Sequence, residues 1–295
     1  MPMTSANGIE LYFDTFGKDT DPTLLLVPGL GAQCVGFDEP LCRQIAALGV
    51  RVVRYDNRDV GLSTHLDGVE ADAMAAVAAA MADQPVDAPY TLSDMAADGL
   101  ALLDSLGVDD AHIVGTSMGG MIAQTMTIEH PERVRSLTSV FSTTGEKDVG
   151  SPDPEVLVGL MGIMTLSEDR ASRVAQGIEL ARLIGTRSVF DEHRVRARTE
   201  MFVDRAYDPA GTGRQMVAIL ASGSRADELP GITAPTVVLH GDADPLIDIS
   251  GGVRTAELVP GSEFRALDGM GHDLPPQYWD RVVDGIGSAV AAAPT

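Results

Sequence analysis

Residues 111–126 read Ala-His-Ile-Val-Gly-Thr-Ser-Met-Gly-Gly-Met-Ile-Ala-Gln-Thr-Met, and this stretch decides the fold class. A short apolar segment leads into the pattern G-x-S-x-G around Ser117, and a segment with helical periodicity follows. The pattern predicts a buried strand that turns sharply into a helix, with the serine at the tip of the turn. Glycines flank the serine because strand and helix approach closely there. The alternative, a glycine-rich turn with an inert serine, is disfavoured because residues that could activate the serine follow downstream.

Length and composition limit the possible classes of protein. The 295 residues suit one large α/β domain, or a core with an inserted subdomain. The hydrophobic fraction of 44% is that of a soluble globular protein. No run of about 18 apolar residues is present, and the first residues lack the basic and apolar regions of a secretory signal. We therefore expect a cytoplasmic protein without stable membrane insertion.

Charge and cysteine content exclude further classes. The net charge of −22 argues against nucleic acid and anionic membranes as partners. Cys34 and Cys42 lack the spacing of a metal site or of a disulfide framework, so we expect reduced thiols. No cluster of metal-ligating residues and no cofactor motif stands out. The sequence predicts neither a metal nor an organic cofactor, and it leaves the oligomeric state open.

Strand and helix signals alternate along most of the chain. The continuously apolar residues 23–27 predict a strand that is buried on both faces of a parallel sheet. The alternation predicts an α/β fold with a doubly wound, mostly parallel sheet. Further strands are expected at 9–16 (an edge strand), 50–55, 135–141, 236–240 and 263–267, and helices at 37–48, 92–106 (capped by Ser93) and 277–292.

One interval, residues 142–228, breaks this alternation. It contains helical segments with methionine and arginine, but no convincing strand. An insertion after a sheet strand, at the end that carries Ser117, would lie over the cleft where ligands bind. We therefore predict an α/β core of residues 1–141 and 229–295 with a helical cap at 142–228; the alternative is packing remote from the site. The alanine-rich residues 70–82 are expected to form a helix beside the entrance.

Two aspartates could orient a base for the serine. A serine hydroxyl needs a base to take its proton, and the base needs a carboxylate to orient it. Asp242 and Asp244 both follow the strand expected at 236–240, where a turn can aim a carboxylate into the cleft. Asp244 is favoured because Pro245 restrains the loop after it. Asp242 is expected to cap the turn through its own backbone.

His272 is the predicted base. It lies in a glycine-rich loop after the strand expected at 263–267, so this loop and that of Asp244 end at the same edge of the sheet. Three other histidines have ordinary structural explanations. His112 lies within a strand, His130 ends a helix, and His240 precedes the loop that carries Asp242 and Asp244 (residues 241–247, the acid loop).

The developing oxyanion needs two backbone donors. Met118, the residue after the serine, supplies one amide, and we expect the amide of Leu30 in the glycine loop (residues 28–32) to supply the other. A phosphate-binding role for this loop is disfavoured because the phosphate-loop motifs are absent. Residues 55–63 follow another strand, and buried arginine–aspartate pairs there are expected to brace the loops behind this site.

With these motifs the chain resembles the α/β-hydrolase superfamily over about residues 9–290. Four segments look like the motifs of one esterase branch, which contains aclacinomycin methylesterase and actinobacterial lipase-like carboxylesterases. These segments are residues 55–63, 115–120, 240–245 and 269–272. The resemblance implies Ser117 as nucleophile, His272 as base and Asp244 as acid, with Leu30 and Met118 as amide donors. Pro28 departs from the pattern, since many relatives have histidine there, but a backbone donor does not need that side chain.

The expected function is a serine carboxylesterase that works through an acyl-enzyme. The same triad could serve thioester, lactone or C–C bond hydrolysis or perhydrolysis, and a ligand-binding protein on this scaffold is a further alternative. Serine at the elbow disfavours dehalogenases and epoxide hydrolases. The expected partner is a small-molecule apolar ester, because the cap segment is rich in apolar side chains. These are Leu157, Leu160, Met161, Ile163, Met164, Leu166, Ile178, Leu183, Ile184, Met201, Phe202, Met216, Ile219 and Leu220.

Overall fold

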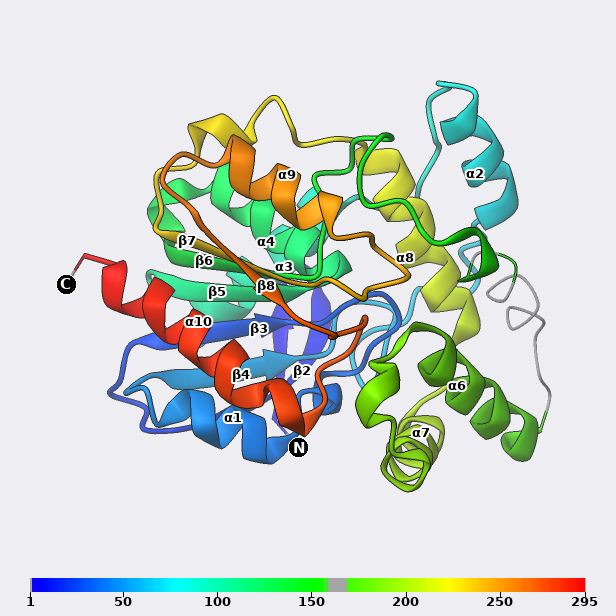
Figure 1. Cartoon of the computed structure of the whole chain (residues 1–295), viewed down its shortest axis with the longest axis horizontal. Coiled ribbons are helices and arrows are strands. Elements are labelled where there is room, and N and C mark those ends of the chain that lie inside the picture. Colours follow the sequence, from blue (N-terminus) through cyan, green and yellow to red (C-terminus); the bar gives the residue numbers. More distant parts are fainter. Residues whose placement is uncertain (1, 157, 159–168, 295) are drawn as a thin grey trace.

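The architecture is an eight-stranded sheet covered by helices on both faces, as seen in a computed structural model that describes residues 2–156, 158 and 169–294 (Figure 1). The strand order is β1-β2-β4-β3-β5-β6-β7-β8. Strands β3 to β8 are mutually parallel, and β2 is antiparallel to β1 and β4. This confirms the predicted fold class. The strands are β1 (Met3–Ala6), β2 (Ile9–Phe16), β3 (Thr23–Val27), β4 (Arg51–Tyr55), β5 (Ala111–Thr116), β6 (Val134–Val140), β7 (Thr236–Gly241) and β8 (Glu263–Leu267).

Alternating side chains of the central strand β3 build the two halves of the core. Leu24 and Leu26 pack in a cluster with residues of α1 and α10, whereas Leu25 and Val27 pack with residues of α3 and α4. Figure 1 shows these helix pairs on opposite faces of the sheet. The helices are α1 (Glu39–Ala46), α2 (Ala73–Met81), α3 (Leu92–Ser105), α4 (Met118–Glu129), α6 (Arg170–Ile184), α7 (Glu192–Arg205), α8 (Pro209–Ser222), α9 (Ser250–Leu258) and α10 (Trp279–Ala292). Short 3-10 helices lie at Cys34–Gly36, Pro131–Arg133, Arg187–Val189 (η3), Leu229–Gly231 and Pro276–Tyr278.

The strand predicted at 9–16 is present as β2, but its predicted place at the edge of the sheet is wrong, because β1 pairs outside it. The two strands form a hairpin in which Asn7 and Gly8 both have positive φ, at 50° and 78°. Asn-Gly is the strongest short signal for such a turn. This dipeptide could therefore have revealed the extra strand.

The predicted helix cap at Ser93 is also wrong. Helix α3 begins at Leu92, so the residue before it, Thr91, is the N-cap. Thr91 and Asp94 exchange side-chain and backbone hydrogen bonds in a capping box. The Ser93 hydroxyl instead donates to Glu129 Oε1 at 2.6 Å, on the neighbouring helix α4.

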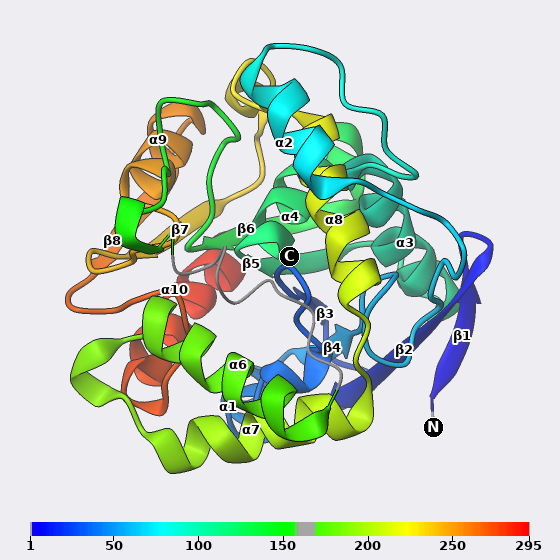
Figure 2. The same ribbon diagram turned by 90° about the vertical axis from the view of Figure 1, so that its right-hand side faces the viewer.

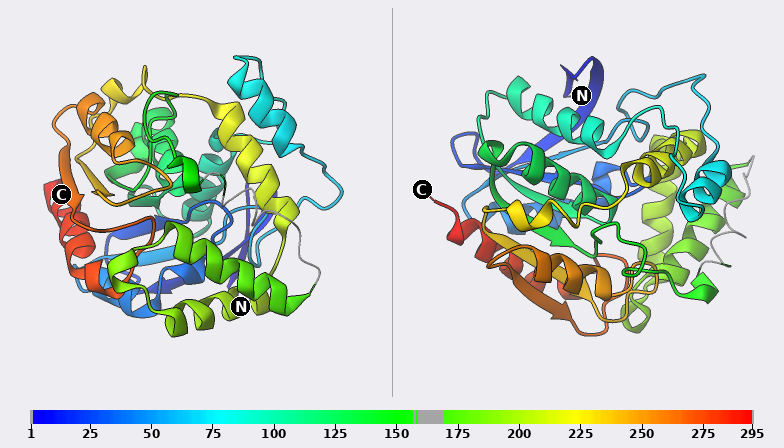
Figure 3. Two further views of the ribbon diagram at one scale, coloured as in Figure 1. Left: turned by 45° about the vertical axis from the view of Figure 1, so that its right-hand side comes forward. Right: turned by 90° about the horizontal axis from the view of Figure 1, so that it is seen from above.

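The described residues of the cap segment, 142–228, contain helices α6, α7 and α8 and no strand. Helices α6 and α7 pack through a small apolar cluster of Val174, Ile178 and Val195, whereas α8 packs against α2 and α3. Figure 1 shows α2, α6, α7 and α8 at the same end of the sheet, and Figures 2 and 3 show that α8 lies beside α2 whereas α6 and α7 form a separate pair. Six apolar residues expected in the cap lie outside the described residues: Leu157, Leu160, Met161, Ile163, Met164 and Leu166.

Among the helices that the structure describes, none combines the length and the apolar character needed to cross a membrane.

Candidate active site

Ser117 sits at a tight elbow between β5 and α4. Its φ and ψ angles are 55° and −122°, a conformation that costs energy for any residue other than glycine. Neighbouring glycines make the elbow possible. A Cβ at Gly115 would lie 2.0 Å from the Gly119 carbonyl oxygen, and a Cβ at Gly119 would lie 2.0 Å from the Val27 carbonyl oxygen. The G-x-S-x-G pattern is therefore a packing requirement of this turn.

The structure brings Ser117, His272 and Asp244 together in one hydrogen-bonded chain. Ser117 Oγ lies 2.9 Å from His272 Nε2, and His272 Nδ1 lies 2.7 Å from Asp244 Oδ2. The imidazole ring also packs at a tilt against Phe141, with ring centroids 4.7 Å apart. The three residues follow strands β5, β7 and β8, whose carboxyl ends meet at one edge of the sheet.

The Asp244 carboxylate is fully buried and still held in its ionised form. Its Oδ1 accepts hydrogen bonds from the backbone N–H groups of Leu246 at 2.9 Å and Ile247 at 3.0 Å. Burial by itself would raise the pKa of this carboxyl group. The charge of His272 and hydrogen bonds from His240, His272 and Ile247 outweigh burial and lower the pKa to about 2. Asp244 therefore carries a negative charge at neutral pH.

Of two neighbours of Asp244, Asp242 differs from the expectation, and His240 has a structural role as expected. Asp242 does not cap its own turn, because its Oδ1 accepts from the Gly269 N–H at 2.6 Å and so braces the histidine loop (residues 268–275). His240 is buried beside the acid, with Nε2 2.8 Å from the Ile247 carbonyl oxygen and 3.5 Å from Asp244 Oδ2. The position of His240 near the end of β7, two residues before Asp242, is the signal in the sequence that could have indicated this contact.

The glycine loop lies directly against the serine. A Cβ at Gly29 would be 3.2 Å from Ser117 Cβ. Helix α4 begins at Met118, so no carbonyl of its own helix can accept from the Met118 N–H. Within the part of the chain that the structure describes, no acceptor takes the N–H of Leu30 or Met118. Both amides are free to bind an oxygen of a ligand.

Side chains from two distant segments hold this loop. Asn57 Nδ2 donates to the Pro28 carbonyl oxygen at 3.1 Å. The Gly31 N–H donates to Gln215 Oε1 of helix α8 at 2.9 Å, and Gln215 Nε2 donates to the Arg58 carbonyl oxygen. The buried Gln215 thereby ties the cap segment to the glycine loop. Sequence reasoning missed Gln215, because a glutamine in a helix carries no signal of a partner so far away.

The buried arginine–aspartate pairs expected in residues 55–63 are present, and two of them reach into the cap segment. Arg58 pairs with Asp98 of α3. Arg205 of α7 pairs with Asp56, and Arg214 of α8 pairs with Asp59. This segment therefore braces the core against the cap helices.

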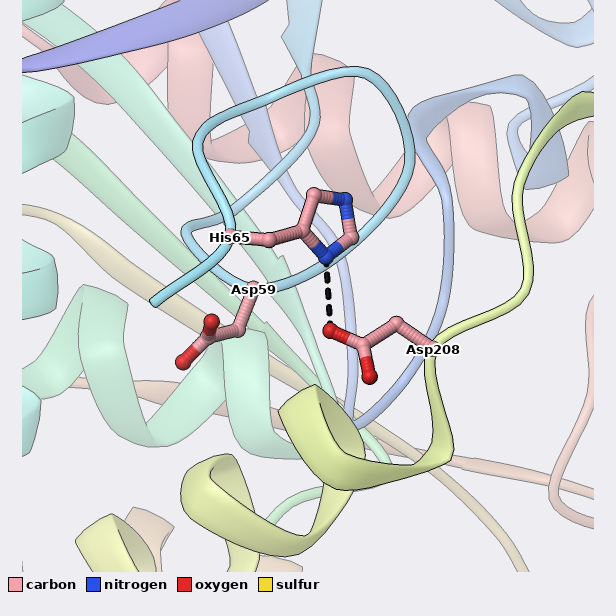
Figure 4. Close-up of side chains that lie close together, drawn as sticks. All are labelled: Asp59, His65 and Asp208. Carbon is pink, nitrogen blue, oxygen red and sulfur yellow. Dashed lines mark hydrogen bonds and ion pairs between the residues drawn. The ribbon is translucent and has the colours of Figure 1, made fainter. Parts of the chain in front are cut away.

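One cluster outside the triad has the composition of a metal site. Candidate ligand atoms of Asp59, His65 and Asp208 lie within 4.8 Å of one another (Figure 4). The protein itself already occupies them. Both Asp59 oxygens accept from Arg214, and Asp208 Oδ2 accepts from Arg214 and faces His65 Nδ1 at 2.7 Å. A cation would have to displace the arginine, so the arrangement fits an ion-pair network better than a metal centre.

His65 makes the stability of this network depend on pH. Burial acts to lower the pKa of His65, but the Asp208 carboxylate and the Gly61 carbonyl on its two ring nitrogens raise it overall. Because the pKa is higher in the folded state, protonated His65 adds to the free energy of unfolding. This contribution is complete below the unfolded-state pKa of about 6.5 and is lost as the pH rises through the folded-state pKa. We expect His65→Gln to lower the Tm more at about pH 6 than at about pH 9. Thermal unfolding of both proteins at the two pH values checks this, and an equal shift at both would contradict it.

A serine at a strand–helix elbow, bonded through histidine to a buried aspartate at the carboxyl edge of such a sheet, defines the class of α/β hydrolases. The chain belongs to the alpha/beta hydrolase fold family, whose model matches residues 22–276.

Individual relatives agree with this assignment. Rhodomycin D methylesterase DnrP of Streptomyces peucetius is 26% identical over an alignment of 295 residues, which covers 92% of each chain. The crystal structure of an enol-lactonase from Burkholderia xenovorans LB400 has a TM-score of 0.77 at 22% identity and covers 98% of this chain and 100% of that one. A meta-cleavage product hydrolase from Pseudomonas fluorescens IP01 has a TM-score of 0.75 at 18% identity, covering 99% and 97%. These likenesses confirm the superfamily and the resemblance to the methylesterase branch, and they place the chain among the hydrolases.

Proposed function

We propose that this chain is a cofactor-free serine carboxylesterase. The observation that carries the proposal is the unbroken chain from Ser117 Oγ through His272 to the buried Asp244, at 2.9 and 2.7 Å. A positioned base and its orienting carboxylate are what a serine hydroxyl requires to become a nucleophile. The free amides of Leu30 and Met118 beside the serine supply the second requirement, stabilisation of an oxyanion.

Each group has a defined role in the proposed reaction. Ser117 Oγ attacks the ester carbonyl while His272 Nε2 takes its proton, and the Leu30 and Met118 amides bind the oxyanion of the tetrahedral intermediate. The proton then passes from His272 to the leaving alcohol, which departs and leaves an acyl-enzyme. Water then attacks the acyl carbonyl while His272 takes a proton from it, and the second tetrahedral intermediate releases the acid as His272 returns that proton to Ser117 Oγ. Asp244 stays ionised throughout and keeps the Nδ1–H of the imidazole directed toward itself.

The substrate proposed is a small apolar ester, with a methyl ester as one form. The relative DnrP is described as a methylesterase, and its alignment covers 92% of both chains. We propose that residues 142–228 form the cap that receives the acyl part. Two contacts support this role: Gln215 binds the glycine loop, and the segment after α6 binds the histidine loop. The net charge of −22 disfavours anionic substrates.

The pH dependence of p-nitrophenyl ester hydrolysis tests the proposed base. His272 must be neutral to accept the serine proton, whereas Asp244, with a pKa lowered to about 2, stays ionised. We expect kcat/KM to fall at acid pH, because a protonated imidazole has no lone pair to take the serine proton. A rate that does not fall at acid pH would count against His272. Oxygen esters, thioesters and lactones of the same acyl group, compared side by side, test the reaction class, and much faster turnover of a thioester or lactone would replace the carboxylesterase assignment.

A further inference from the structure

The segment Ile184–Thr186, which joins α6 to η3, is hydrogen-bonded directly to the histidine loop. The His272 N–H donates to the Ile184 carbonyl oxygen at 2.8 Å, and the Gly271 N–H donates to Thr186 Oγ1 at 2.9 Å. Asp273 Oδ1 accepts from both the N–H and the hydroxyl of Thr186, at 2.9 and 2.6 Å. Three consecutive residues around the proposed base are therefore bonded to one segment of the cap.

This contact is buried and too close to admit another group. Thr186 is 2% exposed. A Cβ at Gly271 would lie 2.6 Å from the carbonyl carbon of Gly185 and 2.8 Å from the Thr186 nitrogen. If the Thr186 hydroxyl were removed, no water could take its place without separating the two backbones, and the buried Gly271 N–H would be left without an acceptor. The position of the histidine loop thus depends on this cap segment.

Polar contacts, together with a few apolar ones such as Phe202 of α7 against Gly36, hold the α6–α7 pair to the core. The pair has its own small apolar cluster around Ile178. Its described links to the core include the ion pairs Arg194–Asp38 and Arg205–Asp56, in addition to the contact at Thr186. A pair of helices with its own cluster and polar attachments can shift as one body.

We propose that Thr186 is a positioning residue that aligns His272 with Ser117 only while the cap segment is seated on the histidine loop. The hydroxyl suits this role because it accepts from Gly271 and donates to Asp273, on either side of His272. The cap segment then binds the histidine loop and aligns the triad at the same time. A substrate that stabilises this contact therefore also completes the catalytic geometry. The inference rests on the proposed function, since it requires His272 to be the base.

The test replaces Thr186 with valine, which keeps the shape and removes the hydroxyl. We expect kcat per active site to fall about 10- to 100-fold, as for a small misplacement of a catalytic group, with KM changed less than about threefold. Thr186→Ser should restore kcat to within about threefold, because it returns the hydroxyl. Thr199→Val is the matched control: the Thr199 hydroxyl bonds the Val195 carbonyl oxygen within α7, so kcat should stay at the parent value.

Active sites are counted by titration with a fluorophosphonate, so that unfolded protein does not lower the measured kcat. Unchanged kcat per active site in Thr186→Val, with activity abolished in His272→Ala, would overturn the inference and leave the proposed function standing. Full activity in His272→Ala would instead overturn the proposed function. Should Thr186→Val fail to fold, Asp273→Ala removes the other half of the link. We expect a loss of about three- to tenfold from it, and parent kcat in that variant would also overturn the inference.

Discussion

Replacing Ser117 with alanine is expected to lower the hydrolysis of short p-nitrophenyl esters by about a thousandfold or more. The variant keeps the amides of Leu30 and Met118, so a small residual rate from oxyanion stabilisation should remain. Alanine has no oxygen for His272 to deprotonate, and no acyl-enzyme can form. The measurement is steady-state kinetics on purified parent and variant, together with labelling by a fluorophosphonate probe, which should mark the parent and spare the variant.

A serine in the next strand provides the matched control. Ser139 lies in β6, paired in register with Gly115 of β5, and its buried hydroxyl has no hydrogen-bond partner among the residues that the structure describes. Ser139→Ala should therefore keep parent activity. Parent-level hydrolysis by Ser117→Ala would refute the nucleophile. Folded parent protein that neither hydrolyses esters nor reacts with the probe would favour a ligand-binding protein on this scaffold.

The sequence predicted the parts of the site that local patterns encode. The elbow around Ser117 needs glycines because backbone atoms approach it closely, and that requirement is visible as a motif. Asp244 and His272 could be placed because each follows a recognisable strand, and the carboxyl ends of parallel strands share an edge. These arguments depend on short spacings and on strand order.

The contacts that support the site leave no such pattern. Gln215, in helix α8, holds the glycine loop, and Thr186, in the turn after α6, holds the histidine loop. Both lie far away in the sequence, and their residue types are common in any helix or turn. Their roles depend on how the cap segment packs, which local propensity does not determine. The strand β1 was missed for a different reason: four residues carry little periodicity, so only the Asn7-Gly8 turn could have indicated it.

Asp244→Asn is expected to lower kcat by about ten-thousandfold, the scale known for loss of the acid in such a triad. Asparagine can still accept from the N–H groups of Leu246 and Ile247, so the acid loop should keep its shape and its stability. It can no longer stabilise an imidazolium. If its amide NH2 faces His272 Nδ1, the proton moves to Nε2, and the base loses the lone pair that must take the serine proton. The measurement is kcat for both proteins, with Tm as a check on folding.

Asp242→Asn is the matched control, since the same change two residues earlier alters only a bond to the backbone. The Asp242 carboxylate accepts from the Gly269 N–H at an exposed position, and the asparagine oxygen can accept that bond equally well. We expect kcat within about threefold of the parent. The reverse result, a crippled Asp242→Asn and an active Asp244→Asn, would assign the acid to Asp242. Equal, severe losses in both would mean that the bond from Asp242 to the histidine loop contributes to aligning His272 as much as the buried carboxylate does.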